Sequence, residues 1–282
     1  MKQYKIRSMV IAPKDHVLVQ FDFSQAESWI VAFLSNEQNM KNALMYGDIH
    51  TETAGSALFY KHTGCNHQWV KKTKTCSVCG KVVTTEMRYS GKRTNHASAY
   101  RMKGPKLATI INKDSDKPPY VTVTNREAKD YIDGWHSYYN IKGWWHEVEE
   151  QLNRNRTIIT CYGRKRVFYS AWGEELFREA TAHEPQSTVA DHANGAIHPE
   201  LGIKGGFLEV YNQFHVPGRI QIINQSHDSI LNIVHKKDLD DIVPQIHKLL
   251  ARPIALRGEM FTIPVDCEYG ERWGEFESYK LS

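Results

Sequence analysis

The chain has 282 residues, of which 41% are hydrophobic and 24% are charged, a balance typical of a folded globular protein. This composition excludes intrinsic disorder, a collagen-like repeat and a coiled coil. No stretch reaches the roughly 20 apolar residues that span a bilayer, and the first residues lack the apolar segment of a secretory signal, so we expect no membrane partner. The net charge of +4 permits a nucleic-acid partner without requiring one.

The N-terminal part predicts a strand followed directly by a helix. Residues 17–23 are β-branched and aromatic, as in a buried strand. Ser24 and Glu27 form the S-x-x-E pattern of a capping box, and the residues after them place Trp29, Ile30, Phe33 and Leu34 on one apolar helical face. Asp22 is therefore expected where the strand ends and the helix begins.

The rest of the chain predicts many helices with a few strands far apart in sequence, which indicates an α+β fold. In chain order we expect a Lys-rich insert at 60–83, a helix at about 85–100, a loop at 112–119, a helix at 125–156 broken near 140–143, a hairpin at 157–169 turning at Gly163, a helix at 174–197, and two strands within 219–234. The turn between the last two strands presents His227 and Asp228.

The cysteines indicate a metal site. Cys65, Cys76 and Cys79 lie close together in the insert, and a disulfide framework would use a dispersed, even set, so we infer a reducing compartment. Cys65-x-His67 and Cys76-x2-Cys79 supply four nitrogen and sulfur ligands for a structural Zn²⁺ ion, with His62 as a competing fourth ligand. The alternative is unligated cysteines in a loose loop, although the insert has few apolar residues that could otherwise hold it. We expect its lysines to contact DNA phosphates: Lys71, Lys72, Lys74 and Lys81.

Two aspartates lie 206 residues apart, each at the edge of a predicted strand in apolar surroundings: Asp22 and Asp228. One interpretation is a helix-capping Asp and a turn Asp, each common by itself. The other is that neighbouring strands bring both carboxylates together to hold two Mg²⁺ ions, which prefer oxygen ligands and stabilise the attacking and leaving oxygens of a phosphoryl displacement.

The helix at 85–100 has an unusual face. Arg88, Lys92 and His96 recur every fourth residue and Asn95 falls between them, so we expect all four on one helical face. That face is basic where a core helix would carry Leu or Ile. It is either a solvated charged face or a surface that lays its cations along a triphosphate.

Three segments occur in the order of the motifs of family-A DNA polymerases, the bacterial polymerase I and phage replicative group. DFSQAESWIVAFLS resembles motif A, RYSGKRTNHASAY resembles motif B with its Arg-x3-Lys-x7-Tyr spacing, and QSHDSIL resembles motif C. The likeness continues through GDIHTETA, EPQSTVADHANGAI and IPVDCEYGERWGE, from about residue 4 to residue 275.

This resemblance implies a palm with a small antiparallel sheet and mainly helical fingers. It implies the first part of the palm at 1–45, fingers at 46–125 with the zinc-ribbon-like insert at about 60–83 and motif B at 88–100, and further helices with the second part of the palm at 126–282, including motif C at 225–231.

The implied activity is template-directed DNA synthesis, with nucleotidyl transfer from a dNTP to a primer 3′-OH. By resemblance, Asp22 and Asp228 hold two Mg²⁺ ions with the Phe23 backbone carbonyl, and Lys92 is a candidate acid for the pyrophosphate leaving group. The implied nucleotide-binding residues are His50, Arg88, Lys92, His96, Tyr100 and Glu27, of which Glu27 also blocks a ribose 2′-OH. The implied contacts to primer–template DNA are Arg178, Gln186 and His227.

Two positions depart from the family pattern. His96 stands where the family often has Phe, and Ser229 follows His227-Asp228 where many relatives have Glu. We expect weaker metal affinity from the second change.

Because the likeness begins just upstream of motif A, we expect neither a thumb nor an exonuclease domain. Either a second polypeptide supplies the thumb, with or without an exonuclease, or the chain is a truncated product. The implied location is the cytoplasm of a bacterial or phage-infected cell. One alternative is a non-catalytic DNA-binding subunit that keeps the polymerase-like fold and uses the zinc ribbon. Another is a single-subunit RNA polymerase, against which Glu27 argues.

Overall fold

The computed structural model describes residues 6–281. The chain divides into two compact units. Unit 1 contains the residues up to Ala26, Ile159–Lys165 and the residues from Gln186 onward, whereas unit 2 contains Glu27–Ile158 and Arg166–Pro185. Within residues 6–281, no helix combines the length and hydropathy needed to cross a bilayer.

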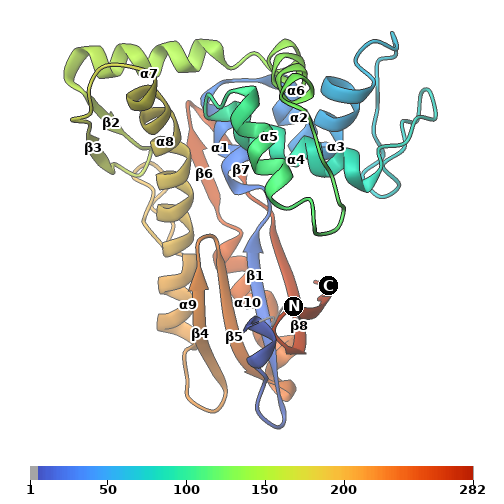
Figure 1. Cartoon of the computed structure of the whole chain (residues 1–282). Coiled ribbons are helices and arrows are strands. Elements are labelled where there is room, and N and C mark those ends of the chain that lie inside the picture. The colour runs from blue at the N-terminus through green and yellow to red at the C-terminus, as the bar shows by residue number, and fades with distance from the viewer. Residues whose placement is uncertain (1–5, 282) are drawn as a thin grey trace. The chain divides into compact units, whose positions relative to one another are not determined.

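Unit 1 is built on a five-stranded sheet with the order β4-β5-β1-β8-β9, in which every neighbouring pair is antiparallel (Figure 1). Its strands are β1 (His16–Phe23), β4 (Ile220–Ser226), β5 (Ser229–His235), β8 (Val265–Arg272) and β9 (Glu275–Ser278). A separate hairpin pairs β6 (Pro253–Leu256) with β7 (Glu259–Thr262). The predicted strand at 17–23 and the predicted strand pair within 219–234 are confirmed.

The two faces of β1 differ in burial. Val17, Val19, Phe21 and Phe23 are buried, and the Phe23 ring lies 6.2 Å from the ring of Phe207 in α9 (Gly206–Phe214). Helices α9 and α10 (Leu239–Leu250) contact strands of the sheet within this unit (Figure 1). Because side chains alternate along a strand, Asp22 points to the face opposite Phe23. Apolar packing on one face therefore fixes which residues the other face presents.

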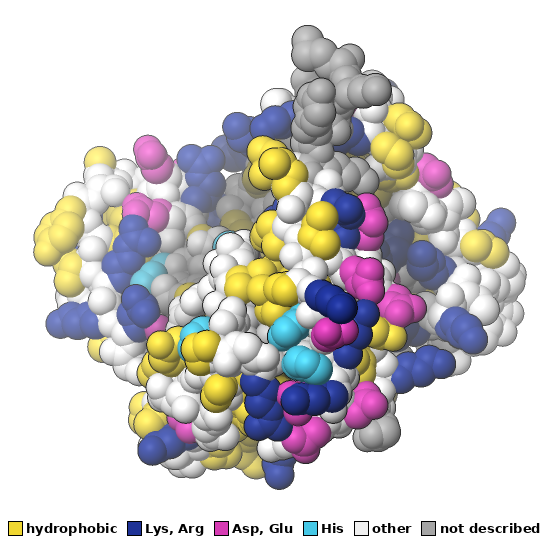
Figure 2. All heavy atoms as spheres, turned by 90° about the horizontal axis from the view of Figure 1, so that it is seen from below, with side chains coloured by type: hydrophobic (Ala, Val, Ile, Leu, Met, Phe, Trp, Pro, Cys, Tyr) yellow, Lys and Arg dark blue, Asp and Glu magenta, His cyan; other side chains and the backbone are white. Residues whose placement is uncertain are grey.

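Several charged residues of unit 1 form ion pairs. Lys236 lies 2.9 Å from Glu271, and Arg219 lies 3.2 Å from Asp238, which belongs to the short helix η3 (Lys236–Asp238). A second short 3-10 helix is η1 (Ile6–Met9). On the face seen in Figure 2, basic and acidic side chains of the described residues are interspersed. The small positive net charge thus does not gather into a basic patch on that face.

Unit 2 is mainly helical (Figure 1). It contains α1 (Ala26–Leu34), α2 (Gln38–Tyr46), α3 (Ile49–Glu52), the π-helix η2 (Thr53–Phe59), α4 (Thr85–Ala99), α5 (Gly104–Lys113), α6 (Asn125–Tyr138) and α7 (Lys142–Asn155). Its core between α4, α5 and α6 includes Leu107, Ile111 and Ala128. The hairpin of β2 (Thr157–Ile159) and β3 (Lys165–Val167) and the helix α8 (Glu174–Asn194) belong in part to each unit.

Two features of these helices were expected from the sequence. The predicted helix at 85–100 is α4, and the long predicted helix at 125–156 is interrupted between Tyr138 and Lys142, close to the expected break. An antiparallel sheet in one unit and helices in the other confirm the α+β class. The assignment of residues 1–45, 46–125 and 126–282 to palm and fingers stays a prediction, because compactness alone does not name a subdomain.

The predicted capping box of Ser24 and Glu27 is wrong. Gln25 adopts a left-handed conformation with φ of 57°, so the helix begins at Ala26, one residue later than the pattern requires. The Ser24 N–H donates to the Pro264 carbonyl at 2.8 Å, and the Glu27 carboxylate accepts from the Tyr100 hydroxyl instead. The turn that follows β1 therefore replaces the capping box at the start of α1.

Gly91 in the middle of α4 marks a close approach between helices. A Cβ atom there would lie 2.5 Å from the His50 carbonyl oxygen and 3.0 Å from the Ala54 nitrogen. Glycine in a helix costs about 1 kcal/mol relative to alanine, so this position gives up helix propensity for the contact of α4 with α3 and η2.

We predict that Gly91→Ala lowers the free energy of unfolding by about 1–3 kcal/mol, because the added methyl group overpacks this contact. Urea unfolding followed by circular dichroism measures the change. Gly143→Ala is the matched control: it lies in α7, where a Cβ atom would meet no neighbouring atom within 4 Å, so it should be neutral or stabilise by up to about 1 kcal/mol. Equal destabilisation of both variants would contradict the packing argument.

Candidate active site

Asp22 and Asp228 lie at the same end of neighbouring strands of unit 1. In the antiparallel register of β1 and β5, Asp22 is directly opposite Ser229, the residue after Asp228. The Phe23 N–H donates to the Asp228 carbonyl at 3.2 Å, which continues the ladder past the last pair. The structure thus brings together two aspartates that are 206 residues apart in sequence.

His227 and Asp228 form the two-residue turn of the β4–β5 hairpin. His227 has φ of 58°, and two-residue hairpins need positive φ at the first turn position. Histidine adopts this conformation more readily than most residues do. Ser229, where the resemblance places an acid in many relatives, donates its hydroxyl to the Ser226 carbonyl at 2.9 Å and so helps to close the turn.

A further carboxylate near Asp22 was not expected from the sequence. Asp266 of β8 is directly opposite Asp22, so both side chains lie on the same face of the sheet. Like charges opposite one another destabilise a strand pair, and oxygen-rich sites of this kind suit hard divalent cations. The alternating burial of Val265, Asp266 and Cys267 is the signal that would have placed Asp266 on the polar face.

In unit 2, Arg88 of α4 forms a bidentate ion pair with Asp48. The Arg88 Nε and Nη2 atoms donate to Asp48 Oδ2 and Oδ1 at 2.7 Å and 3.0 Å. Asp48 also caps α3, where its carboxylate accepts from the Thr51 N–H at 3.2 Å. Burial acts to raise the Asp48 pKa, but the hydrogen bonds from Arg88 and Thr51 outweigh it and hold the pKa at about 2. A guanidinium has five N–H donors, so Arg88 retains donors for a further anion.

His50 is buried, with 4% of its surface exposed, beside α4. Its Nδ1 atom lies 3.0 Å from Asn95 Nδ2, and the Asn95 Oδ1 atom accepts from Trp135 Nε1 at 2.7 Å and from Thr53 Oγ1 at 2.9 Å. Burial, aided by the nearby Arg88 charge, lowers the His50 pKa to about 3. The ring is therefore neutral and, with the Asn95 amide donating to Nδ1, carries its proton on Nε2.

This network corrects the expectation for Asn95. Asn95 was expected beside Arg88, Lys92 and His96 on an exposed basic face, but it is buried and linked to the core. Lys92 and His96 are exposed one turn apart on α4. The expected face is thus confined to the cationic residues, and Asn95 at its edge anchors α4 to the neighbouring elements.

Tyr100 follows the last residue of α4, and its hydroxyl donates to Glu27 Oε2 of α1. Burial together with the Glu27 charge raises the Tyr100 pKa well above its usual value, so the phenol remains a donor. This pairing joins a residue of motif A to the last residue of motif B.

The predicted DNA contacts are all exposed. Arg178 and Gln186 lie on α8, in unit 2 and unit 1 respectively, and His227 lies at the hairpin turn of unit 1. Each is accessible to a partner.

The four predicted zinc ligands converge in the insert. The ligand atoms of Cys65, His67, Cys76 and Cys79 all lie within 4.8 Å of one another. The Cys65 and Cys76 Sγ atoms are 4.0 Å apart, and His67 Nδ1 lies 3.4 Å from the Sγ atoms of both Cys76 and Cys79. Tetrahedral zinc, with bonds of about 2.3 Å to sulfur and about 2.0 Å to nitrogen, would separate its ligands by about 3.8 Å and about 3.5 Å.

The geometry therefore fits Zn²⁺. The histidine that lies with the three cysteines is His67, and not the alternative fourth ligand His62. The second ring nitrogen of His67 lies 2.9 Å from Thr63 Oγ1, an outer contact that orients the ligand. Burial acts to raise the Cys76 pKa, but hydrogen bonds from backbone N–H groups, including that of Cys79, lower it to about 6 and favour the thiolate that binds a metal.

Trp69 fastens the insert to the π-helix η2, a contact that the sequence did not reveal. Its Nε1 atom donates to Ser56 Oγ at 2.9 Å. Its ring covers Gly55 so closely that a Cβ atom there would lie 2.0 Å from the indole. The indole also stacks with His67, with 4.9 Å between ring centroids. A large aromatic residue in a segment poor in apolar residues was the available signal.

Solved structures show the class of fold. The chain is similar to the POL domain of Pol1 from M. smegmatis, in complex with DNA primer-template and dNTP, with a TM-score of 0.69 and 19% sequence identity over 97% of this chain and 43% of that chain. This likeness shows a polymerase-domain fold.

The family follows from the sequence comparisons. The model of DNA polymerase family A matches residues 1–275, and the chain belongs to that family. It is 22% identical to DNA polymerase I of Helicobacter pylori (strain ATCC 700392 / 26695), over 96% of this chain and 26% of that protein. It is 23% identical to the DNA polymerase of Escherichia phage T5, over 88% of this chain and 29% of that protein. The chain spans about a quarter of the length of these curated relatives.

We predict that His50 makes the protein less stable in acid. The His50 pKa is lowered in the folded chain, so below about pH 6.5 the unfolded chain takes up a proton that the folded chain refuses until about pH 3. Stability therefore falls as the pH falls through this window. His50→Gln should reduce the slope of unfolding free energy against pH by up to about 1.4 kcal/mol per pH unit. Denaturant unfolding from pH 4 to pH 7 measures it, and equal slopes would contradict the prediction.

Proposed function

We propose that this chain carries the catalytic site for template-directed DNA synthesis, which transfers a nucleotidyl group from a dNTP to a primer 3′-OH. The observation that carries the proposal is that Asp22, near the end of β1, lies beside Asp228, in the turn that leads into the adjacent strand β5, in a chain of DNA polymerase family A. The naming of residues 1–45 and 126–282 as palm with further helices, and of 46–125 as fingers, is part of the same proposal.

In this proposal Asp22 and Asp228, with the backbone carbonyl of Phe23, hold two Mg²⁺ ions. The residues suit this role, because carboxylate and carbonyl oxygens are the ligands that Mg²⁺ prefers. When bound, the ions supply charge stabilisation to the attacking and leaving oxygens. The protein's own contribution is to fix the two carboxylates through the β1–β5 ladder, so that little reorganisation is needed when substrate binds.

The cationic residues of α4 hold the triphosphate. Arg88 is oriented by its two hydrogen bonds to Asp48, and Lys92 and His96 are exposed on the same helix. Lys92 donates the proton to the pyrophosphate leaving group, as the resemblance implies. His50, held neutral by burial, offers an Nε2 proton to a phosphate oxygen once the site around it opens.

Glu27 and Tyr100 select the sugar. The hydrogen bond between them fixes both side chains, which supports the implied roles of Glu27 against a ribose 2′-OH and of Tyr100 beside the templating base pair. Arg178, Gln186 and His227 contact primer–template DNA in this proposal. A second polypeptide that supplies the thumb and an exonuclease stays a prediction from the sequence.

The zinc-ribbon-like insert is structural in this proposal. Three thiolates and one imidazole fill all four positions of tetrahedral Zn²⁺ and leave no position for substrate. The metal would hold a segment that has few apolar residues of its own, while Trp69 places that segment on η2.

Primer extension with Mg²⁺ tests the catalytic proposal. We expect Asp22→Asn and Asp228→Asn each to lower the rate by at least about a hundredfold, because each removes a charge that stabilises the transition state through the metals. Asp130→Asn is the matched control: it makes the same change at an exposed position of α6 and should leave the rate unchanged. Full activity in the Asp228→Asn variant would refute the proposal. Failure of the parent chain to extend a primer, even together with a polypeptide that supplies the thumb, would refute it as well.

Metal analysis of the purified chain tests the insert. We expect one zinc ion per chain, released by a strong chelator, and loss of bound zinc in Cys79→Ser because the tetrahedron then lacks a thiolate. Cys161→Ser, which lies outside the four-ligand group, should retain zinc in full. Zinc content that is unaffected by Cys79→Ser would rule out this ligand set.

A further inference from the structure

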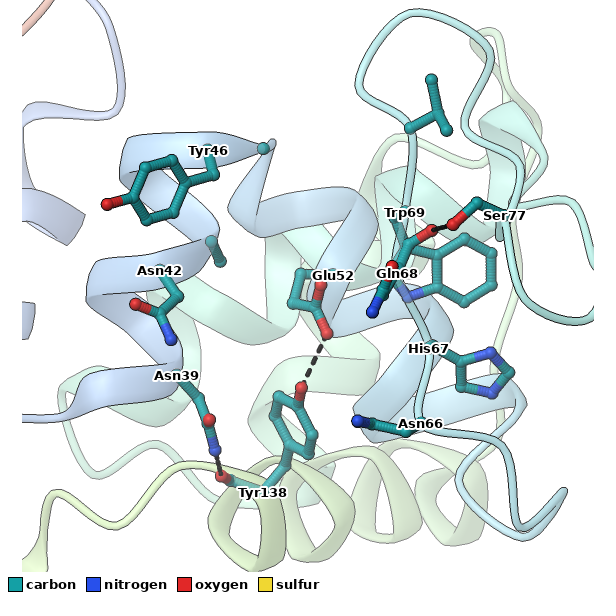
Figure 3. A pocket seen from close by; sticks show the side chains of 13 residues that line it. Asn39, Asn42, Tyr46, Glu52, Asn66, His67, Gln68, Trp69, Ser77 and Tyr138 are labelled. Atoms are coloured by element: carbon teal, nitrogen blue, oxygen red, sulfur yellow. Dashed lines mark hydrogen bonds between the residues drawn. The ribbon is translucent and has the colours of Figure 1, made fainter.

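A cavity of about 570 Å³ lies within unit 2 between α2 and the zinc-ribbon-like insert (Figure 3). Asn39, Asn42 and Tyr46 line it from α2, and Asn66 and Gln68 line it from the insert. In Figure 3 Asn66 and Gln68 extend from the insert toward α2, whereas the Tyr46 ring at the end of α2 is turned away from the insert. Its volume lies in the range of ligand pockets, roughly 300–1,000 Å³. None of the residues proposed to bind metal, triphosphate or sugar lines it, apart from the zinc ligand His67.

The lining is rich in carboxamides and aromatic rings. Asn39, Asn42, Asn66 and Gln68 each carry donors and an acceptor, which suits the mixed hydrogen-bonding edges of a nucleobase. Asn39 donates from its amide to the Tyr138 carbonyl at 3.2 Å, and Asn42 accepts from Gln38 at 2.8 Å, so each retains further hydrogen-bonding capacity. Ordinary small-molecule pockets are mainly apolar, so this composition indicates a polar, planar ligand.

Tyr46 supplies an aromatic face at the rim. The residue is 80% exposed at the end of α2, whereas Trp69 is occupied by its stacking with His67 and Tyr60. Exposed aromatic rings are the usual platforms for unpaired bases in single-stranded DNA. A ring beside amide groups can therefore stack a base and read its edge at once.

The charges around the cavity favour a base inside it and phosphates outside it. Among the described residues that line it there is no Lys or Arg, and its one carboxylate, Glu52, accepts from the Tyr138 hydroxyl at 2.7 Å. The lysines of the insert, Lys71, Lys72 and Lys81, are exposed outside this lining. A phosphate would find no cation among these lining residues, whereas Lys71 and Lys72 directly follow the lining residue Val70 along the chain.

We propose that this cavity binds an unpaired base of single-stranded DNA, stacked on Tyr46 and hydrogen-bonded by carboxamides from α2 and from the insert. The proposal rests on the proposed function, because a template strand ahead of the primer end is the single-stranded DNA that a polymerase meets. The insert lines one side of the cavity, so the proposed site requires both the insert and the helices of unit 2.

Fluorescence anisotropy with a short labelled single-stranded oligonucleotide, measured without nucleotide or Mg²⁺, tests the proposal separately from catalysis. We expect Tyr46→Ala to raise the Kd about fivefold or more, as loss of one base–aromatic stack does. Asn42→Ala on α2 and Gln68→Ala on the insert should each raise it as well, and circular dichroism checks that the variants fold. Asn153→Ala, an exposed carboxamide on α7, should leave the Kd unchanged.

An abasic oligonucleotide of equal length separates base binding from phosphate binding. The abasic strand should bind the parent protein and Tyr46→Ala weakly and with equal affinity. With the intact oligonucleotide, the Kd values of the two proteins should depend on salt concentration in the same way, because a base contact releases no counterions. Equal affinity of the parent protein for intact and abasic strands would overturn the proposal. The proposal would also be overturned if Tyr46→Ala and Asn42→Ala raised the Kd for the oligonucleotide but Gln68→Ala did not. It would likewise be overturned if the variants lost affinity for free deoxynucleotide but not for the oligonucleotide.

Because this measurement needs no catalysis, the two proposals can fail independently. Oligonucleotide binding that depends on Tyr46 in a protein without primer extension would leave the base-binding site standing and remove its link to synthesis. Primer extension with no effect of Tyr46, Asn42 or Gln68 on strand binding would remove the site and leave the polymerase.

Discussion

The register between β1 and β5 is the constraint on which the candidate active site depends. Side chains alternate along a strand, so a slip of one residue would turn Asp22 into the apolar layer and expose Phe23. The register is held by apolar pairs on the covered face, such as Phe21 opposite Ile230 and Val17 opposite Val234. The position of a polar, charged site is thus decided by hydrophobic packing on the other side of the same sheet, and the two-residue turn at His227 then fixes where Asp228 lies.

Unit 2 places its candidate substrate groups in a different way, through buried polar contacts. Arg88 is oriented by Asp48, and His50 is oriented by Asn95, which is itself bonded to Trp135. Buried polar groups are costly unless each is satisfied, so such a network permits few alternative arrangements. The close approach at Gly91 brings α4 near enough to the His50 backbone for these contacts to form. Helix propensity is sacrificed at one position so that several side chains are positioned.

The sequence predicted secondary-structure elements well where the signal is local or periodic. The strand before Asp22, the hairpin at His227, the helix of motif B and the clustering of four Cys and His residues in the insert could all be predicted from spacing. What failed depends on partners distant in sequence: Gln25 in a left-handed turn removes the capping box, and Asn95 is buried because α3 and α6 pack against it. Asp266 and Trp69 were missed for the same reason, since only the sheet pairing and η2 give them their neighbours.

The insert shows how a segment without a hydrophobic core can still form a defined wall. Structural zinc sites contribute apparent binding free energies of roughly 10–16 kcal/mol, which is ample to order a short loop, but a metal bound only by the insert cannot fix its position on the rest of the chain. That position depends on Trp69, which lies between the predicted metal ligand His67 and the surface at Gly55. With zinc bound as proposed, the metal would order the insert, and the contacts of the Trp69 indole would place it on the rest of the chain. Asn66 and Gln68 are the neighbours of His67 in sequence. The side of the cavity that they form therefore depends both on metal binding in the insert and on the contacts of Trp69.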